Sequence, residues 1–288
     1  MTLSLKRRTW SIPGSDGEPI LGETHVPSGT PRGNVIIAHG FKGYKDYGMF
    51  PYLAEKIARW GCFAHRFNFS HSGMTEEIDT FARPDLFEKD TWNKQVEDLR
   101  LIVAAIQSGQ VPGRGVPHVL LGHSRGGAAV LIAAGRDADD PKQRQPAGVI
   151  TLAAPDTAHR FSQEEADLLL KQGYLESPSA RTGQTLRIGG AFLQEQLDDP
   201  ANHDVRGLTA KIRAPLLILH GSDDDTVPET CARSLGEAAT ADVRVSIIPG
   251  ANHVFDTPNP FPEDAEPSEA LAIAEAEIES FLQRVLSP

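Results

Sequence analysis

The sequence has little cysteine and no long apolar run. Among its 288 residues only Cys62 and Cys231 are cysteines, too few for a disulfide framework, and we interpret both as reduced packing residues. No stretch approaches the roughly 18 consecutive apolar residues that a transmembrane helix needs. The basic start, Lys6-Arg7-Arg8, is followed by no apolar segment of signal-peptide length. These features predict a cytoplasmic protein with no membrane partner.

The sequence also has fewer basic than acidic residues. The chain has 28 Lys and Arg residues against 39 Asp and Glu residues, which gives a formal net charge of -11 and a pI near 5.4. Because the summed field of such a chain repels polyanions, we expect no nucleic-acid partner. The mean hydropathy of -0.30 and the hydrophobic content of 40% are ordinary for a globular protein. A small-molecule partner is the simpler expectation, and the oligomeric state stays open, with a homodimer as one option.

Apolar segments of strand length alternate with amphipathic segments of helix length. Strands are predicted at 34–39, 62–69, 116–121, 146–153, 214–220 and 243–248, and helices at 49–60, 89–108, 127–134, 228–239 and 268–286. This alternation predicts an α/β fold with a mostly parallel central sheet and helices on both of its faces.

The alternation breaks between residues 157 and 212. This stretch contains a helix-prone segment at 163–172, two segments at 173–176 and 185–188 that could pair as a hairpin, and a short amphipathic piece at 191–197. We therefore expect a core formed by 1–156 and 213–288 and an inserted cap or lid over 157–212. A surface loop without function is the alternative. Phe161, Tyr174 and Phe192 of the insertion are candidates to line a substrate pocket, or else form the small core of the cap itself.

The segment Gly122-His123-Ser124-Arg125-Gly126 joins a predicted strand to a predicted helix. A turn this sharp holds the serine in a strained conformation with its hydroxyl exposed, and only small flanking residues tolerate it. Since a serine hydroxyl is a weak nucleophile at neutral pH, it needs an imidazole to take its proton and an acid to orient that imidazole. Ser124 is thus a candidate nucleophile that requires two partners.

Both partners follow later in the chain, each just after a predicted strand. His220-Gly221-Ser222-Asp223-Asp224-Asp225-Thr226-Val227-Pro228 supplies carboxylates, and Gly250-Ala251-Asn252-His253-Val254-Phe255 supplies a histidine. The chain order is therefore serine, aspartate, histidine. This order resembles that of the α/β-hydrolase fold, in which serine, acid and histidine follow one another along the chain.

These motifs resemble the α/β-hydrolase superfamily, with GHSRG as its nucleophile elbow, HGSDDDTVP as its acid loop and GANHVF as its histidine loop. The resemblance implies the α/β-hydrolase fold and a triad of Ser124, Asp224 and His253. It selects Asp224 by its spacing from the flanking His-Gly and Val-Pro pairs, and leaves Asp223 and Asp225 to cap the next helix or face solvent. His39, His123 and His220 are expected to be structural.

The segment Ala38-His39-Gly40-Phe41-Lys42-Gly43 resembles the oxyanion-hole loop of the same superfamily. The resemblance implies that the backbone N–H groups of Phe41 and Arg125 stabilise a substrate oxyanion. The Arg125 side chain is free for another role, such as pairing with a nearby carboxylate.

The resemblance extends to the serine aminopeptidase-like branch, which includes bacterial feruloyl or cinnamoyl esterases and lysophospholipase-like enzymes. It implies a serine hydrolase of carboxylic esters that needs no cofactor and no metal, and that acts on a small-molecule ester substrate. Peptidase, thioesterase and acyltransferase activities are alternatives within the fold. A ligand-binding protein that keeps the fold without turnover is the alternative from another class.

Overall fold

The computed structural model describes residues 5–159, 161–262 and 264–287. Within these residues, eight strands form one sheet in the order β1-β2-β4-β3-β5-β6-β9-β10. The strands are β1 (Lys6–Pro13), β2 (Pro19–Val26), β3 (Gly33–Ala38), β4 (Cys62–Asn68), β5 (His118–His123), β6 (Gly148–Leu152), β9 (Leu216–Gly221) and β10 (Val243–Ile248). All pairs from β4 to β10 are parallel, whereas β1 and β2 pair antiparallel at one end. The expected mostly parallel sheet is confirmed.

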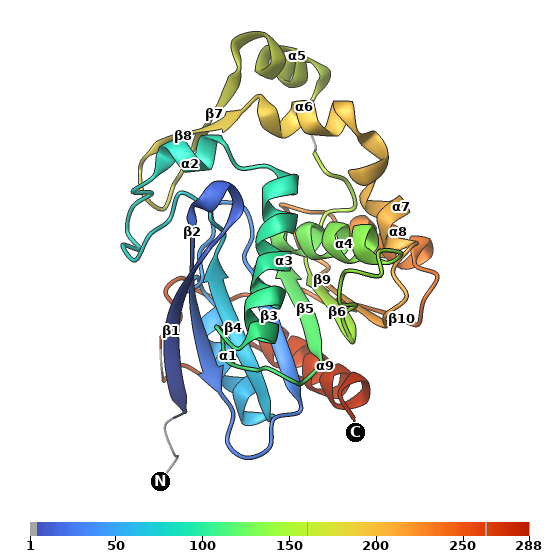
Figure 1. The fold of residues 1–288 in the computed structure, drawn as a ribbon. Helices are drawn as coiled ribbons and strands as arrows, with labels where there is room; N and C mark the ends of the chain where they lie inside the picture. Colours follow the sequence, from blue (N-terminus) through green and yellow to red (C-terminus); the bar gives the residue numbers. More distant parts are fainter. Residues whose placement is uncertain (1–4, 160, 263, 288) are drawn as a thin grey trace.

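Helices cover both faces of the sheet (Figure 1). The helices of the α/β core are α1 (Phe50–Arg59), α2 (Pro84–Glu88), α3 (Trp92–Ser108), α4 (Arg125–Asp137), α8 (Thr230–Ala238) and α9 (Glu269–Val285). Helices α1 and α9 pack against one face with the apolar side chains of β3, β5 and β6, while α3, α4 and α8 pack against the other. The two buried layers place the carboxyl ends of the parallel strands at one edge, where the loops that carry the predicted motifs meet.

A second group of elements follows β6. It comprises α5 (Gln163–Gln172), the hairpin strands β7 (Tyr174–Pro178) and β8 (Thr185–Gly189), α6 (Ala191–Asp198) and α7 (Val205–Thr209), with short 3-10 turns at Pro200–Asn202 here and at Ser15–Gly17 near the N-terminus. The predicted hairpin is confirmed, since Leu175 of β7 lies opposite Ile188 of β8. Figure 1 shows α5, α6 and the hairpin beyond the strand ends of the main sheet, and we call residues 157–198 the cap.

The next helix, α7, belongs to a different environment from the cap helices. Val205 and Leu208 of α7 are completely buried in the same apolar cluster as α4. The division of the chain into a core and an insertion at residues 157–212 stays a prediction. The packing of α7 shows that the last part of this segment lies on the α/β core. No helix of the described residues is long and apolar enough to cross a bilayer. The cellular location stays a prediction.

Candidate active site

The turn between β5 and α4 holds Ser124 in a strained backbone conformation, with φ of 53° and ψ of -123°. The turn is so tight that side chains on its flanking residues would collide with backbone. A Cβ atom on Gly122 would lie 2.2 Å from the carbonyl oxygen of Gly126, and one on Gly126 would lie 2.4 Å from that of Ala38. Both positions therefore need glycine, and the strain at Ser124, of order 1–3 kcal/mol, is balanced by the packing of α4 on the sheet.

The imidazole of His253 lies between the serine and an aspartate. Its Nε2 atom is 3.0 Å from Ser124 Oγ, and its Nδ1 atom is 2.8 Å from Asp224 Oδ2. A hydrogen bond from β5 fixes the loop that carries His253, because the Nε2–H group of His123 donates to the His253 carbonyl oxygen at 2.9 Å. Burial lowers the pKa of His123 to about 3, so this supporting imidazole is neutral at physiological pH.

The Asp224 carboxylate is buried and accepts several hydrogen bonds. Its Oδ1 atom accepts from the backbone N–H groups of Thr226 at 2.9 Å and Val227 at 2.8 Å, and its Oδ2 atom lies 3.2 Å from His220 Nε2. Burial opposes the charge, but the hydrogen bonds with His220 and His253 together hold the pKa of Asp224 well below its ordinary value. The acid is therefore ionised and fixed, so it can orient the imidazole and stabilise its protonated form.

Among the described residues, two backbone amides near Ser124 lack a hydrogen-bond acceptor. In the described part of the chain, the N–H groups of Phe41 and Arg125 donate to no other residue. The loop that carries Phe41 approaches the nucleophile closely, since a Cβ atom on Gly40 would lie 3.0 Å from Ser124 Cβ. Arg125 is the first residue of α4, where unpaired amides and the helix dipole favour negative charge. The pair is suited to receive an anionic oxygen.

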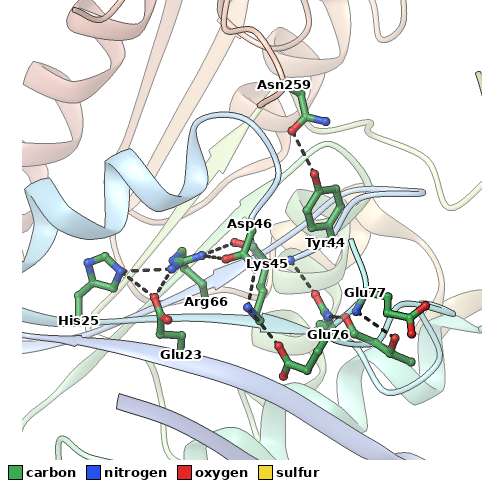
Figure 2. Close-up of polar contacts among 11 residues, drawn as sticks. Glu23, His25, Tyr44, Lys45, Asp46, Arg66, Glu76, Glu77 and Asn259 are labelled. Carbon is green, nitrogen blue, oxygen red and sulfur yellow. Dashed lines mark hydrogen bonds and ion pairs between the residues drawn. The ribbon is translucent and has the colours of Figure 1, made fainter. Parts of the chain in front are cut away.

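A buried network of charged side chains fixes the loop that follows Phe41 (Figure 2). Arg66 of β4 donates to the Lys45 carbonyl oxygen at 2.9 Å and forms ion pairs with Asp46 of the loop and Glu23 of β2. The Lys45 amide donates in turn to Asn68 Oδ1 at 2.7 Å. Only 2% of the Arg66 side chain is exposed, so these contacts are shielded from solvent. Arg66 thereby ties the loop to two strands of the sheet.

Beside Ser124 lies a cavity of about 230 Å³ with predominantly apolar walls. Its lining residues come from the α/β core and from the cap: Phe41, Trp92, Ser124, Arg125, Pro155, Thr157, Ala158, His159, Phe161, Ile188, Phe192 and Val227. An apolar cavity that opens onto a nucleophile is the expected form of a site for the non-reacting part of a substrate.

The three predicted cap residues fall in two places. Phe161 and Phe192 line the cavity beside Ser124, and their rings meet at 6.1 Å between centroids. Tyr174 is not among the lining residues, and its ring stacks instead under the Arg187 guanidinium at 4.1 Å, within the β7–β8 hairpin. Sequence reasoning did not find Trp92 or Ile188. Trp92 starts a helix 32 residues before Ser124, and nothing in its local pattern distinguishes it from a core residue.

The fold and the arrangement of Ser124, His253 and Asp224 define the class of protein. The sequence model of the alpha/beta hydrolase family matches residues 35–272, and the chain therefore belongs to the alpha/beta hydrolase family.

Individual relatives can then be named. A monoacylglycerol lipase from Mycolicibacterium smegmatis is 26% identical, over 89% of this chain and 94% of the lipase. Among solved structures, Est1E from Butyrivibrio proteoclasticus with bound ferulic acid has a TM-score of 0.70 at 20% identity, over 96% of this chain and 99% of Est1E. The esterase domain of a Rhodothermus marinus protein has a TM-score of 0.66, also at 20% identity, over 98% of this chain and 100% of that domain. At these identities, the solved structures establish a common fold.

Proposed function

We propose that this protein is a serine hydrolase that cleaves carboxylic esters through an acyl-enzyme intermediate. The observation that carries the proposal is the hydrogen-bonded series Ser124 Oγ, His253 and Asp224, with 3.0 Å and 2.8 Å between its members. Two unpaired amides and an apolar cavity lie beside that series. The likeness to proteins named lipase and esterase supports the choice of esters as substrates.

In the first half of the reaction, Ser124 Oγ attacks the ester carbonyl carbon while its proton passes to His253 Nε2. The carbonyl oxygen becomes an oxyanion, which accepts hydrogen bonds from the N–H groups of Phe41 and Arg125. Asp224 stabilises the imidazolium without taking the proton. When the tetrahedral intermediate collapses, the bond to the alcohol oxygen breaks, the imidazolium protonates that oxygen, and the alcohol leaves.

In the second half, water attacks the acyl-enzyme. His253 takes a proton from the water and returns it to Ser124 Oγ as the acid departs, which restores the starting state. No step requires a metal or an organic cofactor. The proposed cap supplies part of the cavity wall through Phe161, Ile188 and Phe192, and so bears on which esters fit.

A fluorophosphonate probe and an ester panel test the proposal. The wild-type protein is expected to form a covalent adduct at Ser124, located by peptide mass spectrometry, and to hydrolyse short-chain ethyl and nitrophenyl esters. Ser124→Ala should lose both properties, with a fall in kcat of about 10⁶-fold for the hydrolysis. Ser222→Ala is the matched control, because Ser222 lies in the acid loop and its hydroxyl forms hydrogen bonds only with Asp223 and the Gly250 amide among the described residues.

The outcomes separate the alternatives. If the probe leaves Ser124 unlabelled and no ester is cleaved, the protein is not a serine hydrolase, and a ligand-binding role takes its place. If Ser124 is labelled but only thioesters or aminoacyl amides are cleaved, the mechanism holds and the choice of ester is wrong.

A further inference from the structure

The side chain of Arg125 lies against the cavity, and aromatic rings surround its guanidinium group. The guanidinium carbon is 4.4 Å from the ring centroid of Phe192, 4.9 Å from that of Trp92 and 5.5 Å from that of Phe41. Only 12% of the side chain is exposed. A cation in this position is separated from bulk water, and ring faces replace part of its hydration.

Among the described residues, the hydrogen-bonding capacity of this guanidinium is largely unused. Its Nη2 atom is 3.0 Å from Asp90 Oδ2, close enough for an ion pair. Even so, neither Nη2 nor Nε has a hydrogen-bond partner of suitable geometry among the described residues, and Asp90 Oδ1 has none either. Arginine offers five N–H donors, and leaving buried donors unmet costs free energy. Nε and Nη2 themselves have almost no exposed surface, so an acceptor from outside the protein meets the guanidinium at the exposed 12% of the side chain, which lines the cavity beside the nucleophile.

The charges of Asp90 and Arg125 indicate which kind of hydrogen-bond acceptor on a substrate the site favours. Burial raises the pKa of Asp90 to about 6, although the Arg125 charge opposes this rise. The carboxyl group is therefore mostly ionised at pH 7 to 8, and it offsets the charge of the guanidinium. A substrate carboxylate would bring a second negative charge into an apolar cavity that holds one cation, which is unfavourable. A neutral oxygen accepts the same hydrogen bond without that cost.

We propose that the Arg125 side chain is a specificity-determining residue that selects esters with a neutral acceptor oxygen, such as a ketone or an ether, in the half that occupies the aromatic cavity. The inference rests on the proposed ester hydrolysis and adds a substrate class to it. At roughly 30 Å³ for each water-sized group, the cavity of about 230 Å³ holds a group of about eight non-hydrogen atoms. The half of the ester that enters this cavity is therefore short and oxygenated.

An oxygen scan along the acyl chain tests the proposal. Ethyl hexanoate is compared with ethyl 4-methoxybutanoate, in which an ether oxygen replaces one methylene. Ethyl 3-methoxypropanoate and ethyl 5-methoxypentanoate are each compared with the alkanoate ester of equal chain length. Ethyl 4-oxopentanoate and ethyl 4-methylpentanoate form the ketone pair. The rate of hydrolysis is measured from the acid released. The kcat/KM of each ester is divided by the rate constant of its reaction with hydroxide, which corrects for intrinsic reactivity. A second arm compares 2-methoxyethyl acetate with butyl acetate, so that oxygen in the alcohol half is also tested.

We expect one position of the oxygen to be preferred by about 10- to 100-fold in wild type. The preference should fall to near unity in Arg125→Met, which keeps the length of the stem and the backbone amide but loses every donor. Arg125→Lys, with a single donor centre, should retain part of it. Monoethyl succinate, which carries a carboxylate, should be a poorer substrate than the 4-oxopentanoate ester.

Two variants separate this role from a purely structural one. Ile188→Ala enlarges the cavity without changing a polar group, so it should shift the preferred chain length and preserve the oxygen preference. Thr157→Val removes the hydroxyl of another lining residue and should also preserve it. A structural role for Arg125 would lower activity toward all esters alike, without changing the ratio within each pair.

The scan can overturn the proposal in distinct ways. If wild type hydrolyses the alkanoates as well as their oxygenated partners in both arms, the inference is wrong while the proposed hydrolysis stands, and this result needs no variant to fold. Loss of the preference in Thr157→Val but not in Arg125→Met would also overturn it. If no ester is cleaved and the probe does not label Ser124, the proposed function fails, and this inference fails with it.

Discussion

Asp224 is distinguished from its two aspartate neighbours by its contacts. Among the described residues, the Asp223 and Asp225 carboxylates accept hydrogen bonds only from neighbouring hydroxyl groups and are exposed, whereas Asp224 is buried against His253 and two backbone amides. We predict that Asp224→Asn lowers kcat by about 10⁴-fold, because the amide no longer holds the imidazole in the required tautomer. Asp223→Asn, the matched control, should change kcat less than about 3-fold. Equal losses in steady-state hydrolysis by the two variants would contradict this assignment.

The positions of Ser124, Asp224 and His253 could be anticipated because each directly follows a strand of a parallel sheet. The carboxyl ends of such strands share an edge, so residues 129 positions apart in sequence come within 3.0 Å. The pocket residues could not be anticipated in the same way. Phe161 and Tyr174 are both aromatic residues of the insertion, yet only Phe161 reaches the cavity. Which one does so depends on how the cap folds, and no local pattern encodes that.

The side chain of Arg125 illustrates the same limit at a single residue. Its backbone role follows from its place after the nucleophile, and a carboxylate partner was an open expectation. Asp90, which lies at 3.0 Å, stands 35 residues earlier in the chain, just before α3. Sequence patterns identify residues that occupy special backbone positions more readily than those that meet across the core.

The loop from His39 to Gly48 is held by side chains rather than by pairing with a strand. We predict that Arg66→Met lowers kcat for ester hydrolysis by about 10- to 100-fold with a smaller change in KM, because displacement of the Phe41 amide affects the oxyanion more than the bound ester. Loss of the cation also removes one ion-pair partner from each of Glu23 and Asp46, which keep their contacts with His25 and Lys45, and it should lower the free energy of unfolding by up to about 3 kcal/mol.

Two comparisons make this prediction specific. Arg59→Met removes an exposed arginine that pairs with Glu55 on α1. It should leave kcat and the free energy of unfolding nearly unchanged. Asp46→Asn keeps Arg66 and its bond to the Lys45 carbonyl oxygen, so its kcat should lie between those of wild type and Arg66→Met. A loss of stability in Arg66→Met without any change in kcat would show that the network supports the sheet alone.

Gln184 is one of several contacts that attach the β7–β8 hairpin to the core, beside the packing of Leu186 against Phe81 and Phe87. Gln184 Oε1 accepts from the Phe81 amide at 2.8 Å, and Gln184 Nε2 donates to the Phe81 carbonyl oxygen at 3.2 Å. We predict that Gln184→Ala speeds hydrogen exchange of the Phe81 amide and of the β7 and β8 amides by about 10-fold or more, and leaves α9 unchanged.

Gln163→Ala is the control for that experiment, since Gln163 is exposed and, among the described residues, its side chain bonds only to Asp167 on its own helix. Mass spectrometry of exchanged peptides from both variants gives the readout. If exchange in β7 and β8 is equally slow in wild type and Gln184→Ala, packing rather than this pair of hydrogen bonds holds the hairpin.

Most elements of the core were predictable because their patterns are regular. Strand β10 lies where it was predicted, at Val243–Ile248, and α5 likewise at Gln163–Gln172. Strand β1 escaped prediction because six of its eight residues are exposed, with no alternation of apolar and polar positions. It exists because β2 offers an edge on which it can pair antiparallel. Tertiary pairing, not local pattern, decides such a strand.

At the scale of the whole molecule, buried neutral histidines link stability to pH. Burial lowers the pKa to about 4 for His39 and His118 and to about 3 for His65 and His123. In the unfolded chain these histidines bind protons below pH 6.5, which is their ordinary pKa. In the folded protein they stay neutral until the pH nears 4. Their contribution to stability is therefore complete above pH 6.5 and is lost as the pH falls toward 4.

We predict that each of these histidines adds up to about 1.4 kcal/mol per pH unit to the slope of the unfolding free energy in that window. His65→Gln can keep hydrogen bonds to Thr24 and Asn34, so it should reduce the slope by about this amount with little change at pH 8. Urea unfolding at pH 5, 6, 7 and 8 gives the measurement. An unchanged slope in His65→Gln, and likewise in His118→Gln, would contradict the link.

The position of the insertion in the sheet has a consequence for how this family diversifies. The segment between β6 and β9 leaves and re-enters the sheet at two strands that pair directly, with Val149 opposite Leu216. Because its two ends are fixed on neighbouring strands, the cap within it can lengthen, shorten or be replaced without moving the register of any other strand, whereas α7 packs in the core and stays. Under the proposed function, the part that selects the ester can therefore be exchanged by evolution or design while the part that carries out the reaction is kept.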